Sequence, residues 1–208
     1  MKKSFTLLEI ILCILLLSII SSFFIPKLNK SRIDEVTNML VLYLKQTRYL
    51  SLVDNKYKED DTLWFKKRWT LKFFRCRESV GGLYYSIYSD KNNSGHVSSE
   101  DSLKDPLTNK NIYSSNYCEE REENSKYVLL TKQYKIIDIN VSCNKTSSLG
   151  QISFGNDGNI YTKLSNQENE ESEYLLDEEC IITLKDSFNE ERRIKLNPIS
   201  AYINKITY

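Results

Sequence analysis

The apolar positions of this chain follow three successive patterns. An almost unbroken apolar run extends from Phe5 to Ile25, and Glu9 is its only charged residue. Residues 27–53 then carry apolar side chains at spacings of three and four, which is the stripe of an amphipathic helix. From residue 68 onward the period changes to two, which is typical of strands. The pattern predicts one long helix followed by a β-rich segment.

Turn signals divide the β-rich segment into short strands. Trp69, Leu71 and Phe73 alternate with polar residues, and the NDGN sequence at 156–159 is a strong turn signal. The acidic run at 168–179 is typical of a solvated loop. We predict an α+β fold in which the long N-terminal helix packs on a mostly antiparallel sheet. Strands are expected at 68–75, 83–88, 134–141, 152–154, 160–161, 180–184 and 193–196, and a helical turn at 126–133.

The apolar run has the length of a membrane span. At about 1.5 Å per residue, a helix from Phe5 to Ile25 would reach roughly 30 Å. Lys2 and Lys3 precede it and would keep the N-terminus cytoplasmic. A cleaved secretory signal fits less well, because no small-x-small site ends the run. The sequence predicts a single-pass membrane protein whose C-terminal part is exported.

Composition narrows the classes of function. The chain has 208 residues, a net charge of +1, one His and six Gly. The near-neutral charge argues against a bulk electrostatic hold on nucleic acid. So few His and Gly leave little material for a zinc site, a His-based triad or a phosphate loop. No nucleophile and base stand at a spacing that marks a catalytic pair, so we do not expect an enzyme.

A carboxylate inside an apolar run is costly and suggests a functional role. Glu9 belongs to the sequence KKSFTLLE at 2–9, which resembles the class III signal of type IV pilins and pseudopilins. The resemblance implies that a prepilin peptidase cuts between Ser4 and Phe5 and methylates the new amine of Phe5. It also implies that Glu9 pairs with the Phe5 amine of a neighbouring subunit. The family prefers Gly where this chain has Ser4, so slower or more selective processing is expected.

The same resemblance implies the domain organisation and the partners. Pro26 stands where family members often carry a helix-bending proline. Its partners would be the inner membrane, the prepilin peptidase and other pilin-type subunits. The chain would cross the inner membrane once, with a periplasmic head. The expected segments are a leader at 1–4, a transmembrane and filament-core helix at 5–25, its amphipathic continuation at 26–54, and the head at 55–208.

The cysteines suggest an oxidising compartment. Cys13 falls in the apolar run, and the other four fall in the expected head. We favour the pairs Cys76–Cys118 and Cys143–Cys180, since each would tether a long loop to a strand end. The other two connectivities and free buried thiols remain alternatives. No CxxC spacing is present, which argues against zinc.

One loop resembles a calcium-binding loop. Residues 90–101 place oxygen-bearing side chains at positions 1, 3, 5, 9 and 12 of a twelve-residue pattern, with Gly at position 6. Major pseudopilins bind calcium in a loop of the head, which adds to this expectation. A self-capped surface turn is the alternative. The candidate ligands are Asp90, Asn92, Ser94, His96 (through its carbonyl), Ser98 and Asp101.

The function expected from these features is that of a minor pseudopilin. The C-terminal order, with GQISF at 150–154, a turn at 157–158 and a final hairpin before Pro198, is similar to minor pseudopilins of type II secretion. Such a subunit would join a pseudopilus or type IV pilus that serves protein secretion or DNA uptake. One alternative is an uncleaved, signal-anchored module that binds calcium or another ligand. A second is a DNA-binding competence pilin, because basic and aromatic residues interleave at 64–77.

Overall fold

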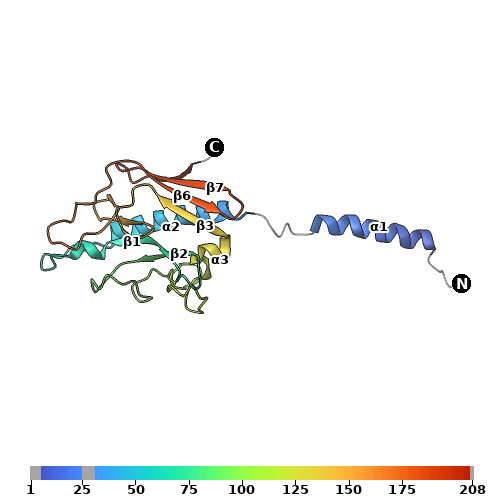
Figure 1. Cartoon of the computed structure of the whole chain (residues 1–208), viewed down its shortest axis with the longest axis horizontal. Coiled ribbons are helices and arrows are strands. Elements are labelled where there is room, and N and C mark those ends of the chain that lie inside the picture. Colours follow the sequence, from blue (N-terminus) through green and yellow to red (C-terminus); the bar gives the residue numbers. More distant parts are fainter. Residues whose placement is uncertain (1–5, 25–30, 207–208) are drawn as a thin grey trace. The chain divides into compact units, whose positions relative to one another are not determined.

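A computed structural model describes residues 6–24 and 31–206 of the chain. The chain divides into two compact units, Met1–Lys30 and Ser31–Tyr208. The first contains α1 (Leu7–Phe24), and the second, which we call the head, contains all the other helices and strands (Figure 1).

The helix α2 (Ile33–Val53) is amphipathic, as its sequence pattern predicted. Ile33, Val36, Leu40 and Leu44 recur at spacings of three and four, and all four are fully buried. Thr47 is buried on the same face, because its hydroxyl donates a hydrogen bond to the Tyr43 carbonyl oxygen at 2.6 Å. The stripe is therefore the face by which α2 packs into the head.

The strands form two four-stranded antiparallel sheets. The first has the order β2-β1-β4-β5 and the second the order β3-β6-β7-β8. The first sheet comprises β1 (Trp69–Arg75), β2 (Leu83–Tyr88), β4 (Gln151–Phe154) and β5 (Ile160–Tyr161). The second comprises β3 (Ile136–Val141), β6 (Cys180–Asp186), β7 (Glu191–Leu196) and β8 (Ile203–Ile206).

Short helical segments connect these strands. A 3₁₀ turn, η1 (Trp64–Lys67), leads into β1, and a second one, η2 (Lys126–Val128), leads into α3 (Leu130–Tyr134). Together, η2 and α3 match the helical turn that the sequence predicted at 126–133. Each predicted strand is present, whereas β8 was not predicted.

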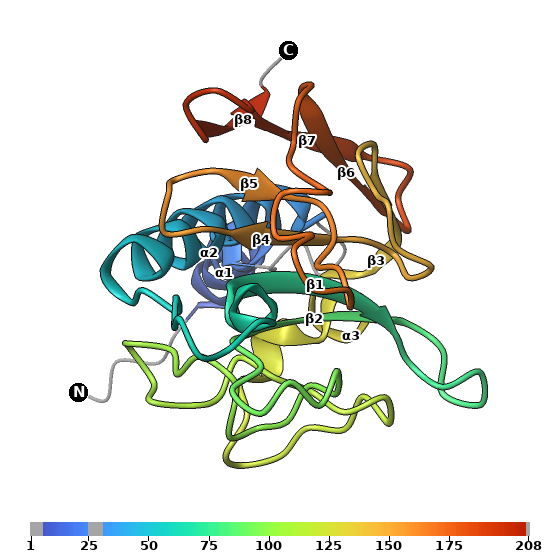
Figure 2. The same cartoon turned by 90° about the vertical axis from the view of Figure 1, so that its left-hand side faces the viewer.

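The core lies where α2 meets both sheets. α2 contacts β1 and β4 of the first sheet and β6, β7 and β8 of the second. In Figure 2, β7 and β8 lie above α2 and β1 and β2 lie below it. Leu71 and Phe73 are fully buried, as are Ile87 and Tyr85, the residues opposite them on β2. One face of β1 and β2 is thus committed to the core.

The predicted fold needs correction in two respects. The helix is not continuous, because α1 ends at Phe24 and α2 begins at Ile33. Residues 31 and 32, directly before α2, are not helical, and Pro26, which was expected to bend the helix, lies outside the described residues. The strands also form two sheets instead of one, since the β3–β6 pair begins a second sheet.

The predicted membrane span is wrong. Within residues 6–24 and 31–206, no helix combines the length and the apolar character needed to cross a membrane. α1 has 18 residues, or about 27 Å, where a span takes roughly 20 residues. This finding overturns the transmembrane segment at 5–25 and the single-pass inner-membrane localisation.

Candidate functional site

The start of α1 is built around Glu9. The backbone N–H of Thr6 donates a hydrogen bond to Glu9 Oε2 at 2.8 Å, and the Thr6 hydroxyl donates to the same oxygen at 3.0 Å. In return, the Glu9 N–H donates to Thr6 Oγ1 at 3.3 Å. This reciprocal arrangement is a capping box, which satisfies amides that a helix start leaves without partners. Glu9 therefore has a local role in starting α1.

Sequence reasoning missed the part played by Thr6. The signal was present, because Thr6 and Glu9 form the T-x-x-E pattern directly before an apolar run. Ser4, Phe5 and Pro26, the other residues expected to act in processing and assembly, lie outside the described residues.

The surface of α1 is apolar all round. Its large apolar side chains from Leu7 to Ile20 are exposed, from 46% for Ile10 to 76% for Leu7. Cys13 is exposed on the same helix as a free thiol. A helix that is apolar on every side is normally buried. α1 thus presents an apolar surface that another apolar surface could bury.

Several polar groups of the loop at 90–101 form hydrogen bonds within the loop. The two carboxylate oxygens of Asp90 accept hydrogen bonds from the backbone N–H groups of Ser94 at 3.0 Å and Gly95 at 2.8 Å. Asn92 Oδ1 also accepts from the Ser94 N–H, at 3.0 Å. These are the bonds of a self-capped turn.

The other candidate ligands of this loop pair among themselves. Ser98 Oγ donates a hydrogen bond to Asp101 Oδ2 at 2.6 Å, and the His96 carbonyl accepts one from Ser94 Oγ at 3.1 Å. The described part of the chain contains no group of three or more His, Cys, Asp or Glu residues that could hold a metal ion. Calcium binding by this loop stays a prediction.

Two disulfides are present in the head, and they are the pairs that the sequence favoured. Cys76, directly after β1, is bonded to Cys118, and their Cα atoms are 5.8 Å apart. Cys143, shortly after β3, is bonded to Cys180 at the start of β6, with the Cα atoms 5.3 Å apart. Each bond ties a long connection to the end of a strand.

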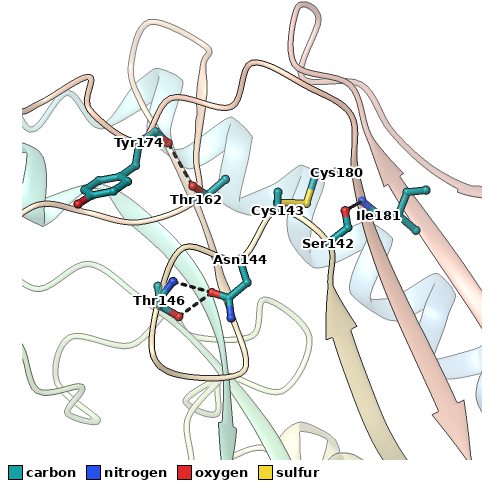
Figure 3. The surroundings of a disulfide bond; sticks show 8 residues. All are labelled: Ser142, Cys143, Asn144, Thr146, Thr162, Tyr174, Cys180 and Ile181. Atoms are coloured by element: carbon teal, nitrogen blue, oxygen red, sulfur yellow. Dashed lines mark hydrogen bonds between the residues drawn. A yellow bond between two sulfur atoms is a disulfide. The ribbon is translucent and has the colours of Figure 1, made fainter.

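The second disulfide is supported by hydrogen bonds on both sides (Figure 3). Ser142 Oγ accepts a hydrogen bond from the Ile181 N–H at 2.9 Å, and the Ser142 N–H donates to the Ile181 carbonyl at 3.0 Å. Beyond the cysteine, Asn144 Oδ1 accepts from the N–H of Thr146 at 2.8 Å and from its hydroxyl at 2.7 Å. The loop after β3 is thus held in place on the second sheet.

The basic and aromatic segment at 64–77 is largely committed to packing. Phe65 and Phe73 are buried in the head. Arg68 is also buried, and its guanidinium stacks 3.7 Å from the centre of the Tyr161 ring. Burial lowers the pKa of Arg68, and its Nη1 donates a hydrogen bond to the Glu171 carbonyl at 2.6 Å. DNA binding by this segment, which needs exposed rings and cations, stays a prediction.

The comparisons with protein-family models, curated proteins and solved structures found no match to this chain. The function proposed for it therefore rests on its own residues.

Proposed function

We propose that this chain is a pilin-like structural subunit, in the manner of a minor pseudopilin, that assembles into a filament through α1. The observation that carries the proposal is the exposed apolar surface of α1 within a unit separate from the folded head. Helices of other subunits with the same character provide a matching surface, since burying apolar side chains stabilises by about 25 cal/mol per Å².

The proposed processing step supports this use of α1. A peptidase of the prepilin type would hydrolyse the Ser4–Phe5 bond, which leaves a new α-amine on Phe5. Glu9 of one subunit would pair with the Phe5 amine of the next. A buried charge is strongly unfavourable alone and tolerated when paired, so this pair would favour assembly in one register.

The two disulfides fit a head that folds in an oxidising compartment. Subunits of this type serve both secretion machines and DNA uptake machines. We propose the type of subunit and not the machine to which it belongs.

The test compares two substitutions at Glu9 in cells that assemble the filament. Gln can replace Glu in a capping box but carries no charge. Glu9→Gln should therefore keep α1 helical and still lose most of the filament, and Glu9→Ala should lose it too. Filament yield is measured by shearing and immunodetection, and Glu100→Ala, which removes an exposed carboxylate of the head, is the matched control.

Normal filament yield from Glu9→Gln would contradict the charge pair and leave Glu9 only its capping role. The N-terminal mass of the protein, measured with and without the peptidase, tests the processing step. A methylated Phe5 terminus is expected only when the peptidase is present. An intact Met1 in both samples would contradict processing and favour the uncleaved binding module.

A further inference from the structure

The first sheet has a second face, formed by the side chains of β1 and β2 that alternate with Leu71, Phe73, Tyr85 and Ile87. Lys72 and Ser86 stand opposite each other on β1 and β2, and Phe74 stands opposite Tyr84. These four residues alternate with the core-facing side chains of the same strands. Together with parts of the connections at 95–97 and 113–116, they line a cavity of about 300 Å³. This volume is at the lower end of the range typical of small-molecule sites.

The lysine of this cavity, Lys72, has no counter-charge among the described residues. Lys72 is half-buried, and burial lowers its pKa. No described carboxylate forms an ion pair or hydrogen bond with it, and no Asp or Glu lines the cavity. Its ammonium lies 5.4 Å from the centre of the Phe74 ring. A lysine that is partly removed from water without a partner favours binding of an anion.

A hydroxyl group in the cavity also lacks a partner. Ser86 is fully buried, and its Oγ has no hydrogen-bond partner among the described residues. Leaving a buried hydroxyl unpaired is unfavourable, and such groups usually bond to water or a ligand. Ser86 is directly opposite Lys72, so a neutral donor and a cation belong to the same part of the cavity wall.

The aromatic wall of the cavity defines the rest of the ligand. The rings of Phe74 and Tyr84 stack with centroids 5.0 Å apart and an angle of 15° between their planes. Burial raises the pKa of Tyr84 to about 12, so its hydroxyl keeps its proton and adds no negative charge. The wall therefore suits an apolar or planar group next to the anionic one.

We propose that this cavity binds a small organic carboxylate. Its carboxylate accepts hydrogen bonds from Lys72 and Ser86, and its apolar part packs against Phe74 and Tyr84. One lysine balances one negative charge, which matches a carboxylate better than a phosphate dianion. This role is independent of assembly through α1, because it uses only residues of the head.

The experiment titrates the full-length chain with benzoate, by calorimetry in a buffer without phosphate or carboxylate. Benzoate should bind at a single site, and benzyl alcohol, which has the same ring without the charge, should bind about tenfold more weakly. Lys72→Met keeps the apolar stem and removes the charge, and it should weaken benzoate binding by about tenfold. Ser86→Ala should weaken it by about two- to tenfold.

The matched control is Lys145→Met, an exposed lysine in the loop after β3, which should leave benzoate affinity unchanged. Far-UV and near-UV circular dichroism verify that each variant keeps the wild-type fold. Absence of benzoate binding to the wild type, or equal affinity in Lys72→Met and wild type, would overturn the proposal. Displacement of benzoate by inorganic phosphate at lower concentration would overturn the assignment of a carboxylate.

Discussion

The helices α1 and α2 follow each other in the chain, yet they meet opposite environments. α2 confines its apolar residues to one face, and that face is buried by strands of both sheets. α1 is apolar on every side, and its large side chains stay exposed. α2 therefore packs against strands of its own chain. The partner of α1, in our proposal, is another subunit.

The largest expected effect on stability comes from truncating a side chain on the buried face of α2. Leu44→Ala removes a fully buried side chain from the core of the head and should lower the free energy of unfolding by about 2–5 kcal/mol. Urea denaturation followed by tyrosine and tryptophan fluorescence measures the loss.

Leu12→Ala makes the same change on α1, where the leucine is 58% exposed. It should leave the unfolding of the head within about 0.5 kcal/mol of wild type and reduce filament yield instead. If Leu12→Ala lowered head stability as much as Leu44→Ala, the distinction between the two helices would be refuted.

The cysteines give the next largest contrast. Replacing both Cys143 and Cys180 by Ala removes a cross-link between residues that are 37 apart in sequence. The head should lose about 2–4 kcal/mol of unfolding free energy, because the unfolded chain regains the freedom that the loop had lost. Cys13→Ala, which removes the free thiol of α1, is the control and should not change head stability. Thermal unfolding under non-reducing conditions compares the two variants.

The smallest effect concerns the electrostatic anchor of α2. Asp34 in its first turn forms ion pairs with Arg192 of β7, at 2.9 Å, and with Lys205 of β8. Hydrogen bonds from Arg192 and Lys205 hold the pKa of Asp34 well below its usual value. The contribution to stability is therefore present above the unfolded pKa of about 3.9 and is lost as the pH falls through the lower folded pKa.

Since Asp34 is half-exposed, Asp34→Asn should cost at most about 1 kcal/mol at pH 7. The difference from wild type should shrink as the pH falls below about 4. Urea midpoints recorded between pH 2 and pH 7 test this. A difference that stays constant down to pH 2 would show that charge is not its source.

Much of the head could be predicted because its signals are local. The stripe on α2, the alternation in β1 and the NDGN turn each lie within a few residues, and periodicity alone reports them. The favoured disulfide pairing was also correct, since each pair ties a long connection to the end of a predicted strand.

The errors concern relations between distant residues. Whether strands join one sheet or two depends on pairings such as β3 with β6, which no local pattern encodes. In the acidic run at 168–179, Leu176 is buried, and its N–H donates a hydrogen bond to the Ile160 carbonyl at 2.8 Å. The cavity at Lys72 was missed for the same reason, because the pairing of Lys72 with Ser86 appears only once the register is known.

The cover of α2 by β7 and β8 has a consequence for biosynthesis. Val53, the last residue of α2, leaves the ribosome about 150 residues before Ile203, the first residue of β8. At a translation rate of about 5–20 residues per second, β8 follows α2 out of the ribosome after roughly 8–30 s, and until then the apolar face of α2 lacks its last covering strand. During that interval the nascent chain carries both the apolar α1 and the partly uncovered apolar face of α2. Exposed apolar surface of this kind favours aggregation, so the head is most open to misassembly before β8 has been translated.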